Sequence, residues 1–307
     1  MMPLSMERLL ICIVGPTAVG KTDLGIKVAK KLKTEIISAD SRQIYKGMSI
    51  GTAAPTENER IEVKHHFINF LDPSKTYSAG DFARDSTLFL SEFFNTHKVA
   101  VMVGGSGLYI KGVVDGFDDV PSDENIRKTL NDRVESHGLQ SLAQQLTSLD
   151  PEMANKMDLQ NTQRVVRALE VCLTSGKSLT SFQNNTTAKR DFDILQIGLE
   201  MPRTELQDRI AQRTHLMIEA GWVAETTKLI PFSHNNSLKT VGYNELLSYL
   251  RKECSLEEAK DKIAIKTRQF AKRQMTWFKK DQRIVWFNRT NAHKAWEYCI
   301  DFASKYE

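Results

Sequence analysis

The chain has 307 residues, of which 41% are hydrophobic and 26% charged, and its formal net charge is +4. This composition excludes a disordered protein, and the length suffices for one large domain with an insertion or for two domains. The four cysteines lack C-x-x-C spacing, and no apolar run approaches the roughly 18 residues needed to span a bilayer. We therefore expect a cytoplasmic protein with buried thiols and no membrane partner, and the small positive charge alone identifies no ligand.

Residues 9–22, LLICIVGPTAVGKT, join a short apolar run to the pattern G-x-x-x-x-G-K-[ST]. The run predicts a buried strand, and the loop predicts a cradle of backbone N–H groups for a di- or triphosphate at the start of a helix. Lys21 would contact the outer phosphate, and the Thr22 hydroxyl would bind a phosphate-bound Mg²⁺. A ligand-free glycine turn needs neither residue. The predicted phosphate-binding residues are Gly15, Pro16, Thr17, Ala18, Val19, Gly20, Lys21 and Thr22.

The next segments predict a helix over 23–32 and a second strand from residue 35. This strand, loop, helix and strand order is typical of a doubly wound parallel sheet, whose ligands bind at the carboxyl ends of the strands. Asp40 follows the second strand and should reach the same edge as the phosphate loop. It could accept a proton from a nucleophile, coordinate Mg²⁺ or cap a turn, and the pattern leaves all three open.

A third strand, KVAVMV, ends in the glycine-rich turn 104–107. Consecutive glycines allow a ligand to approach the backbone closely. The hydroxyl of Ser106 could bind a diphosphate oxygen or a nucleotide base, or it could belong to an ordinary turn. No aspartate ends this strand, as an ATPase with a Walker B motif would normally require.

From about residue 121 the apolar strands give way to amphipathic segments, which predict helices over 123–136, 139–149, 151–157 and 162–174. The polar segment 183–190 marks the end of this region, and the strand 194–199 follows it. We therefore predict an α/β fold with a P-loop NTPase-like parallel sheet flanked by helices (residues 1–119 and 191–307) and an all-helical insertion domain (120–190). Gln163, Arg164 and Arg167 would lie on one helix, where the arginines either contact phosphates or form a solvated face.

The last third predicts four helices, over 203–220, 223–230, 243–250 and 256–280, before a final strand and a terminal helix. Arg209 and Arg213 lie four residues apart, so they could either reach the phosphate site or pair with neighbouring acidic residues. Between residues 260 and 283 there are nine basic and two acidic residues, a charge pattern typical of nucleic-acid binding. The interleaved Phe270, Trp277 and Phe278 are expected in the core more than as stacking platforms.

Taken together and in this order, seven segments resemble the tRNA dimethylallyltransferases, also called tRNA isopentenyltransferases. They cover most of the chain, which makes the resemblance far more specific than a phosphate loop alone. The segments are GPTAVGKT (15–22), ADSRQIYKGMSIGTAAP (39–55), HHFINFLDPSKTYSAGDF (65–82), VGGSGLYIKG (103–112), NTQRVVRALEV (161–171), TVGYNELLSYL (240–250) and TRQFAKRQMTWF (267–278).

The resemblance implies transfer of a dimethylallyl group from dimethylallyl diphosphate to N6 of the adenosine that follows the anticodon of tRNA. The phosphate loop would then hold the donor diphosphate rather than transfer phosphate, which fits the missing Walker B acid. Asp40 would accept the N6 proton, Arg209 would bind the leaving diphosphate, and Ser106, where the family usually has threonine, would keep its hydroxyl role. The tRNA contacts implied are Asp40, Ser41, Arg42, Gln43, Ser106, Lys128, Gln163, Arg164, Val165, Val166 and Arg167.

The resemblance also implies Mg²⁺ as the cofactor, and we expect a monomer. Two other functions stay open on the residues alone. A small-molecule or nucleotide kinase would use ATP on the same loop and produce ADP. A non-catalytic RNA-binding protein would use the loop as a nucleotide-regulated switch, and replacing Asp40 by alanine would then leave its activity intact.

Overall fold

The computed structural model describes residues 7–182 and 188–306. By its internal contacts the chain forms two compact units. One, the sheet unit, contains the residues up to Val114 together with those from Arg190, and the other, the helical unit, is Asp115–Lys189. Both divisions fall within five residues of the boundaries expected from the sequence, and residues 183–187 of the predicted polar segment lie outside the described part.

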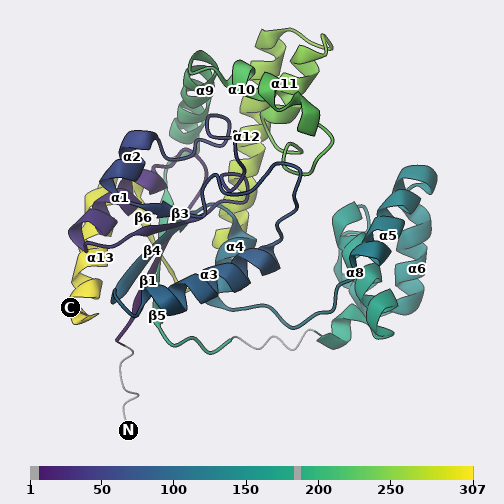
Figure 1. The fold of residues 1–307 in the computed structure, drawn as a ribbon, viewed down its shortest axis with the longest axis horizontal. Coiled ribbons are helices and arrows are strands. Elements are labelled where there is room, and N and C mark those ends of the chain that lie inside the picture. The colour runs from purple at the N-terminus through teal and green to yellow at the C-terminus, as the bar shows by residue number, and fades with distance from the viewer. Residues whose placement is uncertain (1–6, 183–187, 307) are drawn as a thin grey trace. The chain divides into compact units, whose positions relative to one another are not determined.

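The sheet unit is built on six parallel strands in the order β3-β2-β4-β1-β5-β6. Figure 1 shows the sheet between its flanking helices. In β1 the register is set by Leu9 opposite Val99 of β4 on one side and Asp193 of β5 on the other. The carboxyl ends of the strands therefore meet at one edge, where the chain turns into the loops that carry polar residues. The strands are β1 (Leu9–Val14), β2 (Ile36–Ala39), β3 (His65–His66), β4 (Val99–Gly104), β5 (Asp193–Glu200) and β6 (Ile284–Asn288).

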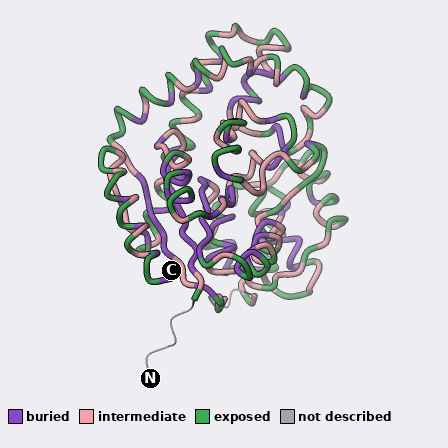
Figure 2. The backbone as a smooth tube through the Cα atoms, turned by 60° about the vertical axis from the view of Figure 1, so that its left-hand side comes forward, coloured by how far each residue is buried: buried purple, intermediate pink, exposed green. Residues whose placement is uncertain are grey.

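Helices cover both faces of this sheet, and the alternation of side chains along β1 shows why. Leu9, Ile11 and Ile13 pack on one face with α1 (Lys21–Lys31) and α13 (Ala292–Ala303). Leu10, Cys12 and Val14 pack on the other with α3 (Ala79–Phe93) and α4 (Gly107–Val114). All six residues of β1 are fully buried, as expected for a central parallel strand, and Figure 2 shows the buried tube of the strands.

A third apolar cluster joins the segment after β2 to the helices of the last third. Ile44, Tyr45 and Met48 pack there against Trp222 and Tyr243. This cluster anchors the loop that follows Asp40 to the helices α10 and α11. The remaining helices of the sheet unit are α2 (Glu57–Glu62), α9 (Arg203–Glu219), α10 (Trp222–Lys228), α11 (Tyr243–Leu250), α12 (Leu256–Phe278) and the short 3-10 turns η2 (Ile230–Phe232), η3 (Arg289–Asn291) and η4 (Ser304–Tyr306).

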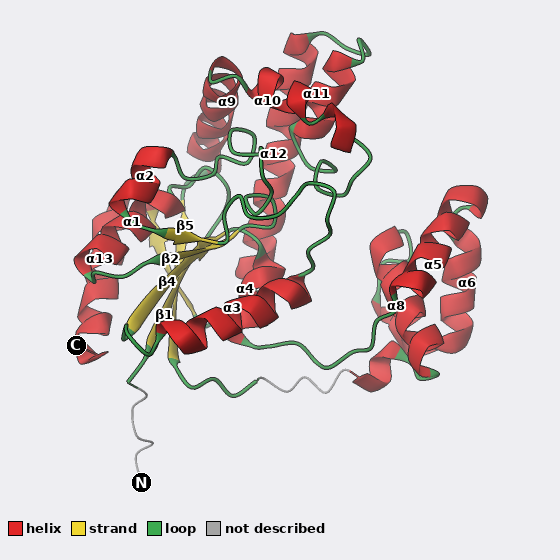
Figure 3. Cartoon of the chain, viewed as in Figure 1, coloured by secondary structure: helices red, strands yellow, loops and turns green. Residues whose placement is uncertain are grey.

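The helical unit has its own apolar core, to which each of its helices contributes buried side chains. Figure 3 shows these helices and the loops that join them. Asp123, Asp150 and Asn161 accept hydrogen bonds from backbone N–H groups at the starts of three of these helices, which satisfies donors that a helix leaves unpaired. The elements are α5 (Glu124–His137), α6 (Gln140–Leu149), α7 (Pro151–Lys156), α8 (Thr162–Ser175) and the 3-10 turn η1 (Leu179–Phe182).

The structure confirms the predicted fold class, a parallel sheet flanked by helices. Helices α2 and α4 were not among the predicted elements, because α2 is one and a half turns long and α4 follows directly on a glycine turn. Cys254 is half-buried rather than buried, and it is unpaired like the other three cysteines. Within the described ranges no helix is both long and apolar enough to cross a membrane.

Candidate active site

The phosphate loop between β1 and α1 leaves a group of backbone N–H donors unpaired. Within the described chain the N–H groups of Ala18, Gly20, Lys21 and Thr22 have no acceptor. A side chain at Gly15, whose φ is +141°, would collide with the carbonyl oxygen of Leu199, so the turn requires glycine at its first position. The buried Val19 side chain anchors the loop in the core. The loop thus presents a set of donors suited to an anion.

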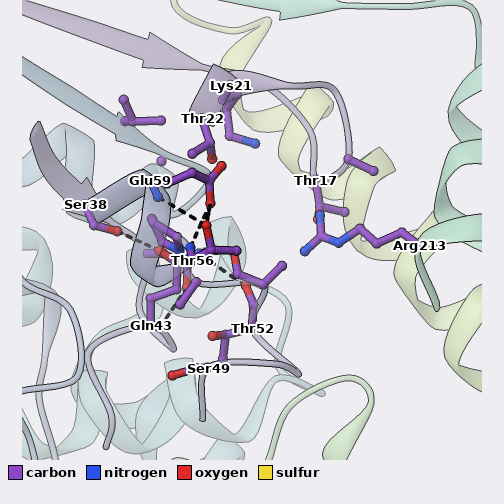
Figure 4. A pocket seen from close by; sticks show the side chains of 18 of the residues that line it. Thr17, Lys21, Thr22, Ser38, Gln43, Ser49, Thr52, Thr56, Glu59 and Arg213 are labelled. Atoms are coloured by element: carbon purple, nitrogen blue, oxygen red, sulfur yellow. Dashed lines mark hydrogen bonds between the residues drawn. The ribbon is translucent and has the colours of Figure 1, made fainter. Parts of the chain in front are cut away.

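Lys21 and Thr22, the first two residues of α1, line the same cavity (Figure 4). The ammonium of Lys21 donates a hydrogen bond of 2.7 Å to the carbonyl oxygen of Pro16. Burial and the nearby Arg213 lower the pKa of Lys21 to about 7, although Asp40 acts in the opposite direction. An anion in the loop would favour the charged form of this lysine. The hydroxyl of Thr22 has no hydrogen bond in the described chain.

Of the two arginines on α9, Arg213 is the more deeply placed. Its guanidinium donates to the Thr17 hydroxyl at 3.1 Å, and Figure 4 shows it directed at the loop. Arg209, the arginine expected to bind the leaving diphosphate, is exposed and donates to the carbonyl oxygen of Ala18 at 2.9 Å. Neither forms an ion pair within the described ranges. Both reach the phosphate loop, and the structure favours Arg213 as the inner cation.

Asp40 follows β2, and the two oxygens of its carboxylate differ in their hydrogen bonding. Oδ1 accepts hydrogen bonds from the N–H groups of Arg42 at 2.9 Å and Gln43 at 3.3 Å, which is the turn-capping geometry considered above. No hydrogen bond from the described residues reaches Oδ2. Asp40 lines both cavities at this edge. A capped, oriented carboxylate with one free oxygen can accept a proton from a ligand.

Ser106 supports the Asp40 turn from the strand next to it. Its hydroxyl oxygen accepts a hydrogen bond from the N–H of Ser41 at 2.9 Å, and its own N–H donates to the carbonyl oxygen of Ala39 at 3.2 Å. Gly104 is in close contact with the backbone of Ala39, which only a glycine allows there. The structure thus gives Ser106 a backbone-fixing contact.

Arg42 and Gln43, two of the expected tRNA contacts, form hydrogen bonds with other parts of the sheet unit through their side chains. The amide of Gln43 accepts from the Ser38 hydroxyl at 2.9 Å and donates to the carbonyl oxygens of Thr52 and Ala53. The guanidinium of Arg42 donates to the carbonyl oxygen of Asn236 at 2.6 Å. Both side chains therefore order loops at the rim of the cleft.

A carboxylate that the sequence analysis did not single out holds the far wall of the cleft. Glu225, on α10, accepts hydrogen bonds from the N–H groups of Ile50 and Gly51 at 2.8 and 2.9 Å and from the Tyr243 hydroxyl at 2.6 Å. These bonds fix the loop containing Thr52, which lines both cavities. The partners of Glu225 lie 18 and about 175 residues away from it in sequence, so no local pattern in the sequence indicates its role.

The site opens into two cavities that share the phosphate loop and Asp40. The larger, of about 840 Å³, contains Lys21, Thr22 and Arg213. The second, of about 410 Å³, has several apolar walls and also reaches Ser41 and Ser106. Those walls include Ile210, Met217, Trp222, Val241, Ile263 and Phe270. Cavities lined by both polar and apolar residues suit a ligand that carries both a charged and a hydrocarbon group.

The basic helix α12 borders these cavities. Of the nine basic residues between 260 and 283, six lie on α12 and three follow it. Four of the nine pair with acidic residues, for example Lys266 with Glu245 at 2.7 Å. Arg268, Lys272 and Arg273 are exposed, and Arg273 lines the second cavity. Of the three aromatic residues expected in the core, only Phe278 is buried, because Phe270 and Trp277 are 39% and 38% exposed.

The candidate RNA-binding residues of the helical unit form three groups: exposed, half-buried and buried. Lys128, Gln163 and Arg164 are exposed. Arg167 is half-buried and donates to the carbonyl oxygens of Pro121 and Val120 at 3.1 and 3.2 Å.

Val165 and Val166, the third group, have side chains that are 0% and 4% exposed and lie in the core of the helical unit, because their positions in the helical period face inward. An RNA contact by these two residues would therefore be made by the backbone, and it stays a prediction.

The sheet, the phosphate loop and the cleft at the carboxyl edge define the class of this protein: an α/β protein with a P-loop NTPase-like fold. Residues 43–281 match the family model described as IPP transferase. The tRNA dimethylallyltransferase of Christiangramia forsetii is 49% identical over 92% of this chain and 94% of its own length. The tRNA dimethylallyltransferase 1 of Phocaeicola vulgatus is 42% identical over 95% and 98%. The chain therefore belongs to the IPP transferase family.

Solved structures agree with this assignment. The full-length tRNA isopentenylpyrophosphate transferase of Bacillus halodurans superposes with a TM-score of 0.71, at 35% identity and 98% coverage of both chains. A eukaryotic dimethylallyltransferase described as acting on tRNA superposes with a TM-score of 0.77, at 26% identity over 92% of this chain and 74% of that one. The family resemblance inferred from the seven sequence segments is confirmed.

Proposed function

We propose that this protein transfers the dimethylallyl group of dimethylallyl diphosphate to N6 of the adenosine that follows the anticodon of tRNA. The observation that carries the proposal is the free Oδ2 of Asp40 at the same sheet edge as the unpaired N–H groups of the phosphate loop. Oδ2 of Asp40 can accept the proton that a nucleophile loses, and the loop N–H groups can bind a leaving group that is an anion. The names of the relatives support the donor and acceptor classes.

The proposed reaction exchanges one bond for another. The lone pair of the adenine N6 attacks the allylic carbon and forms a C–N bond while the C–O bond to the diphosphate breaks. The diphosphate keeps the electron pair of that bond. The proton released from N6 goes to Oδ2 of Asp40, whose Oδ1 stays fixed by the two backbone N–H groups.

Charge develops on the leaving diphosphate, and the site has donors arranged for it. The four unpaired N–H groups, Lys21 and Arg213 would stabilise this charge without reorganising during the reaction. Arg209, at the outer side of the same loop, would bind the diphosphate more weakly because it is exposed to water. The resemblance implied Arg209 for this role, and the assignment proposed here gives the larger share of it to Arg213.

The residues present fit a magnesium ion bound together with the diphosphate. Thr22 offers a hydroxyl without another partner, and the described chain contains no group of three or more His, Cys, Asp or Glu that would form an all-protein cage. Mg²⁺ commonly keeps several waters and is held by one or two protein oxygens plus phosphate oxygens. Thr22 would hold it, and the ion would supply further neutralisation of the diphosphate charge.

The second cavity suits the dimethylallyl group and the base that accepts it. Its apolar walls, including Ile210 and Phe270, would surround the dimethylallyl group, and Ser41 and Arg42, which also line it, would contact the adenine. An enzyme that modifies a base takes it out of the stack, and the bases of a single-stranded loop leave it readily. Every residue lining the two cavities belongs to the sheet unit of one chain, so we propose a monomeric enzyme. Since its proposed substrate is tRNA, we also propose that it acts in the cytoplasm.

The test is to incubate the purified protein with Mg²⁺, dimethylallyl diphosphate and an anticodon stem–loop RNA with an adenosine 3′ of the anticodon. Mass spectrometry of the RNA should show a gain of one isopentenyl unit on that adenosine, with release of diphosphate. A matched RNA with purine riboside at that position, which lacks the exocyclic amine, should gain nothing.

Two other outcomes would replace the proposal. ADP formed from ATP in a parallel tube with no gain of mass on the RNA would support a kinase. RNA binding that responds to nucleotide without any covalent change would support a switch protein.

A further inference from the structure

Gln274, on α12, connects two loops of the cleft through one buried side chain. Its Oε1 accepts a hydrogen bond of 2.8 Å from the N–H of Thr17 in the phosphate loop. Its Nε2 donates a bond of 2.9 Å to the carbonyl oxygen of Gly105 in the turn after β4. The residue is only 7% exposed, and its bond to Gly105 is buried. One amide thus fixes the separation of two backbone segments.

The turn that Gln274 holds is itself bonded to the segment around Asp40. Ser106, the residue after Gly105, contacts the backbone on both sides of Asp40 through the carbonyl oxygen of Ala39 and the N–H of Ser41. A continuous series of hydrogen bonds therefore runs from the phosphate loop through Gln274 and Ser106 to the Asp40 turn. The first end binds the donor in the proposed reaction, and the second end carries the base.

We propose that Gln274 is a positioning residue that sets the distance between the donor diphosphate and the proton-accepting oxygen of Asp40. The inference rests on the proposed function, because it assigns the two ends of the series to the donor and to the acceptor. Displacing a reactant by about 1 Å can reduce the rate roughly 10²-fold even when binding is kept.

The chemistry of the two contacts requires a side chain with an acceptor and a donor at one end. Glutamate would still accept from Thr17, but its second oxygen would face the carbonyl oxygen of Gly105. Methionine has a similar shape and makes neither bond. A side chain at position 105 would collide with Nε2 of Gln274, so this close approach also depends on the glycine.

The helix does not need Gln274 to stay in place. Ala271, one turn earlier, packs with Leu206 and Ile210 of α9, and Phe278, one turn later, packs in the cluster under the sheet. These buried contacts hold α12 on both sides of the amide. Loss of the amide should therefore change the spacing of the loops more than the fold.

The test compares Gln274→Met with Gln269→Met, the replacement of an exposed glutamine on the same helix. With saturating RNA and donor, Gln274→Met should lower kcat about 30- to 100-fold. Its dissociation constant for the stem–loop RNA should stay within about twofold of the wild type, as expected for an effect on geometry rather than binding. Gln269→Met should behave as the wild type does. An unchanged kcat in folded Gln274→Met, in an assay where the wild type prenylates RNA, would overturn the inference.

Gln274→Glu gives a second readout that a purely structural role would not move. A protonated glutamic acid can donate to Gly105 while still accepting from Thr17, so the activity of Gln274→Glu relative to wild type should rise as the pH falls. The relative activity of Gln274→Met should not change with pH. A flat ratio for both variants would count against the inference, and this test remains if Gln274→Met does not fold. A wild type without any prenylation would instead reject the proposed function.

Discussion

The carboxyl edge of the sheet and helix α8 of the helical unit both gather polar side chains, but they use them differently. At the sheet edge, side chains such as Gln43 and Glu225 hold the backbone, while other groups have no partner within residues 7–182 and 188–306. These are the loop N–H groups, the Thr22 hydroxyl and Oδ2 of Asp40. On α8 the buried Glu170 pairs with Arg127 and Arg167 at 2.8 and 3.0 Å.

The difference shows that the residue type alone does not distinguish a ligand-binding site from a structural one. What distinguishes them is whether the polar groups already have protein partners. The sheet edge has donors and an acceptor without a protein partner among the described residues, and neighbouring side chains that are themselves hydrogen-bonded orient them. In the helical unit Arg167 sits in a motif typical of RNA contact, yet its bonds stabilise the start of that unit. Substitutions in the two regions should therefore have different effects.

The largest effect is expected at Asp40. Asp40→Asn keeps the shape of the side chain but cannot accept the proton from N6, so kcat should fall about 10³-fold, within the usual range for a general base. The affinity for RNA and the melting temperature should stay near those of the wild type. Single-turnover rates and RNA binding measured on the same preparation check this. A kcat within tenfold of the wild type would exclude Asp40 as the base.

The two arginines of α9 should differ in effect. Arg213→Gln removes the inner cation beside Thr17 and should lower kcat about 10²-fold, as expected for one charge-stabilising donor. Arg209→Gln, the matched change at the exposed position, should cost about threefold or less because water screens that charge. Steady-state kinetics with varied donor diphosphate separate the two. Equal losses would mean that both arginines contact the diphosphate alike.

The third effect is on stability. Glu170 has a fully buried carboxylate, and Glu170→Gln should lower the free energy of unfolding by about 2 kcal/mol at pH 7 through the loss of charge-assisted hydrogen bonds. Burial by itself would raise the pKa of Glu170, but the hydrogen bonds from Arg127 and Asp123 outweigh it and the pKa is lowered. The stabilisation is thus complete above the unfolded pKa of about 4.3 and is lost as the pH falls through the lower folded pKa.

Melting curves of wild type and Glu170→Gln from pH 7 down to about pH 2 test this sign, since the difference in melting temperature should stay constant down to the unfolded pKa of about 4.3 and shrink only below it. A difference that grows on acidification would mean that the folded pKa is raised instead.

The smallest effect is expected from the exposed cations of the helical unit. Lys128→Ala and Arg164→Ala should each raise KM for RNA about three- to tenfold, leave kcat unchanged and reduce the salt dependence of binding by roughly one ion each. Val165→Ala is the matched control with a buried side chain, and it should lower stability without changing the salt dependence. Binding titrations at several salt concentrations decide between these outcomes.

The sequence was sufficient to predict the parts of the site that depend on local pattern. The apolar run and the glycine motif predict β1 and its loop, and the order of strands brings Asp40 and Ser106 to the same edge. The elements of the helical unit agree with the periodicity of their apolar residues within a few positions. These features need no knowledge of which segment contacts which.

The rest depends on contacts between distant segments. Glu225 and Gln274 are indistinguishable in the sequence from other polar residues on amphipathic helices, and their partners lie between 169 and 257 residues away, apart from Tyr243. The ranking of Arg213 over Arg209 depends on how α9 lies on the loop. The spacing of apolar residues in α8 does predict that Val165 and Val166 face inward, whereas the family resemblance implied that both contact tRNA.

The position of the helical unit in the sequence has a consequence for biosynthesis. β1 lies between β4 and β5, and the whole helical unit is encoded between those two strands. During translation the contacts of the helical unit are local and form early, whereas one side of β1 has no partner until residues 193–200 have been made. The phosphate loop, first in the sequence, is thus completed late, since Leu199 and Gln274 both contact it.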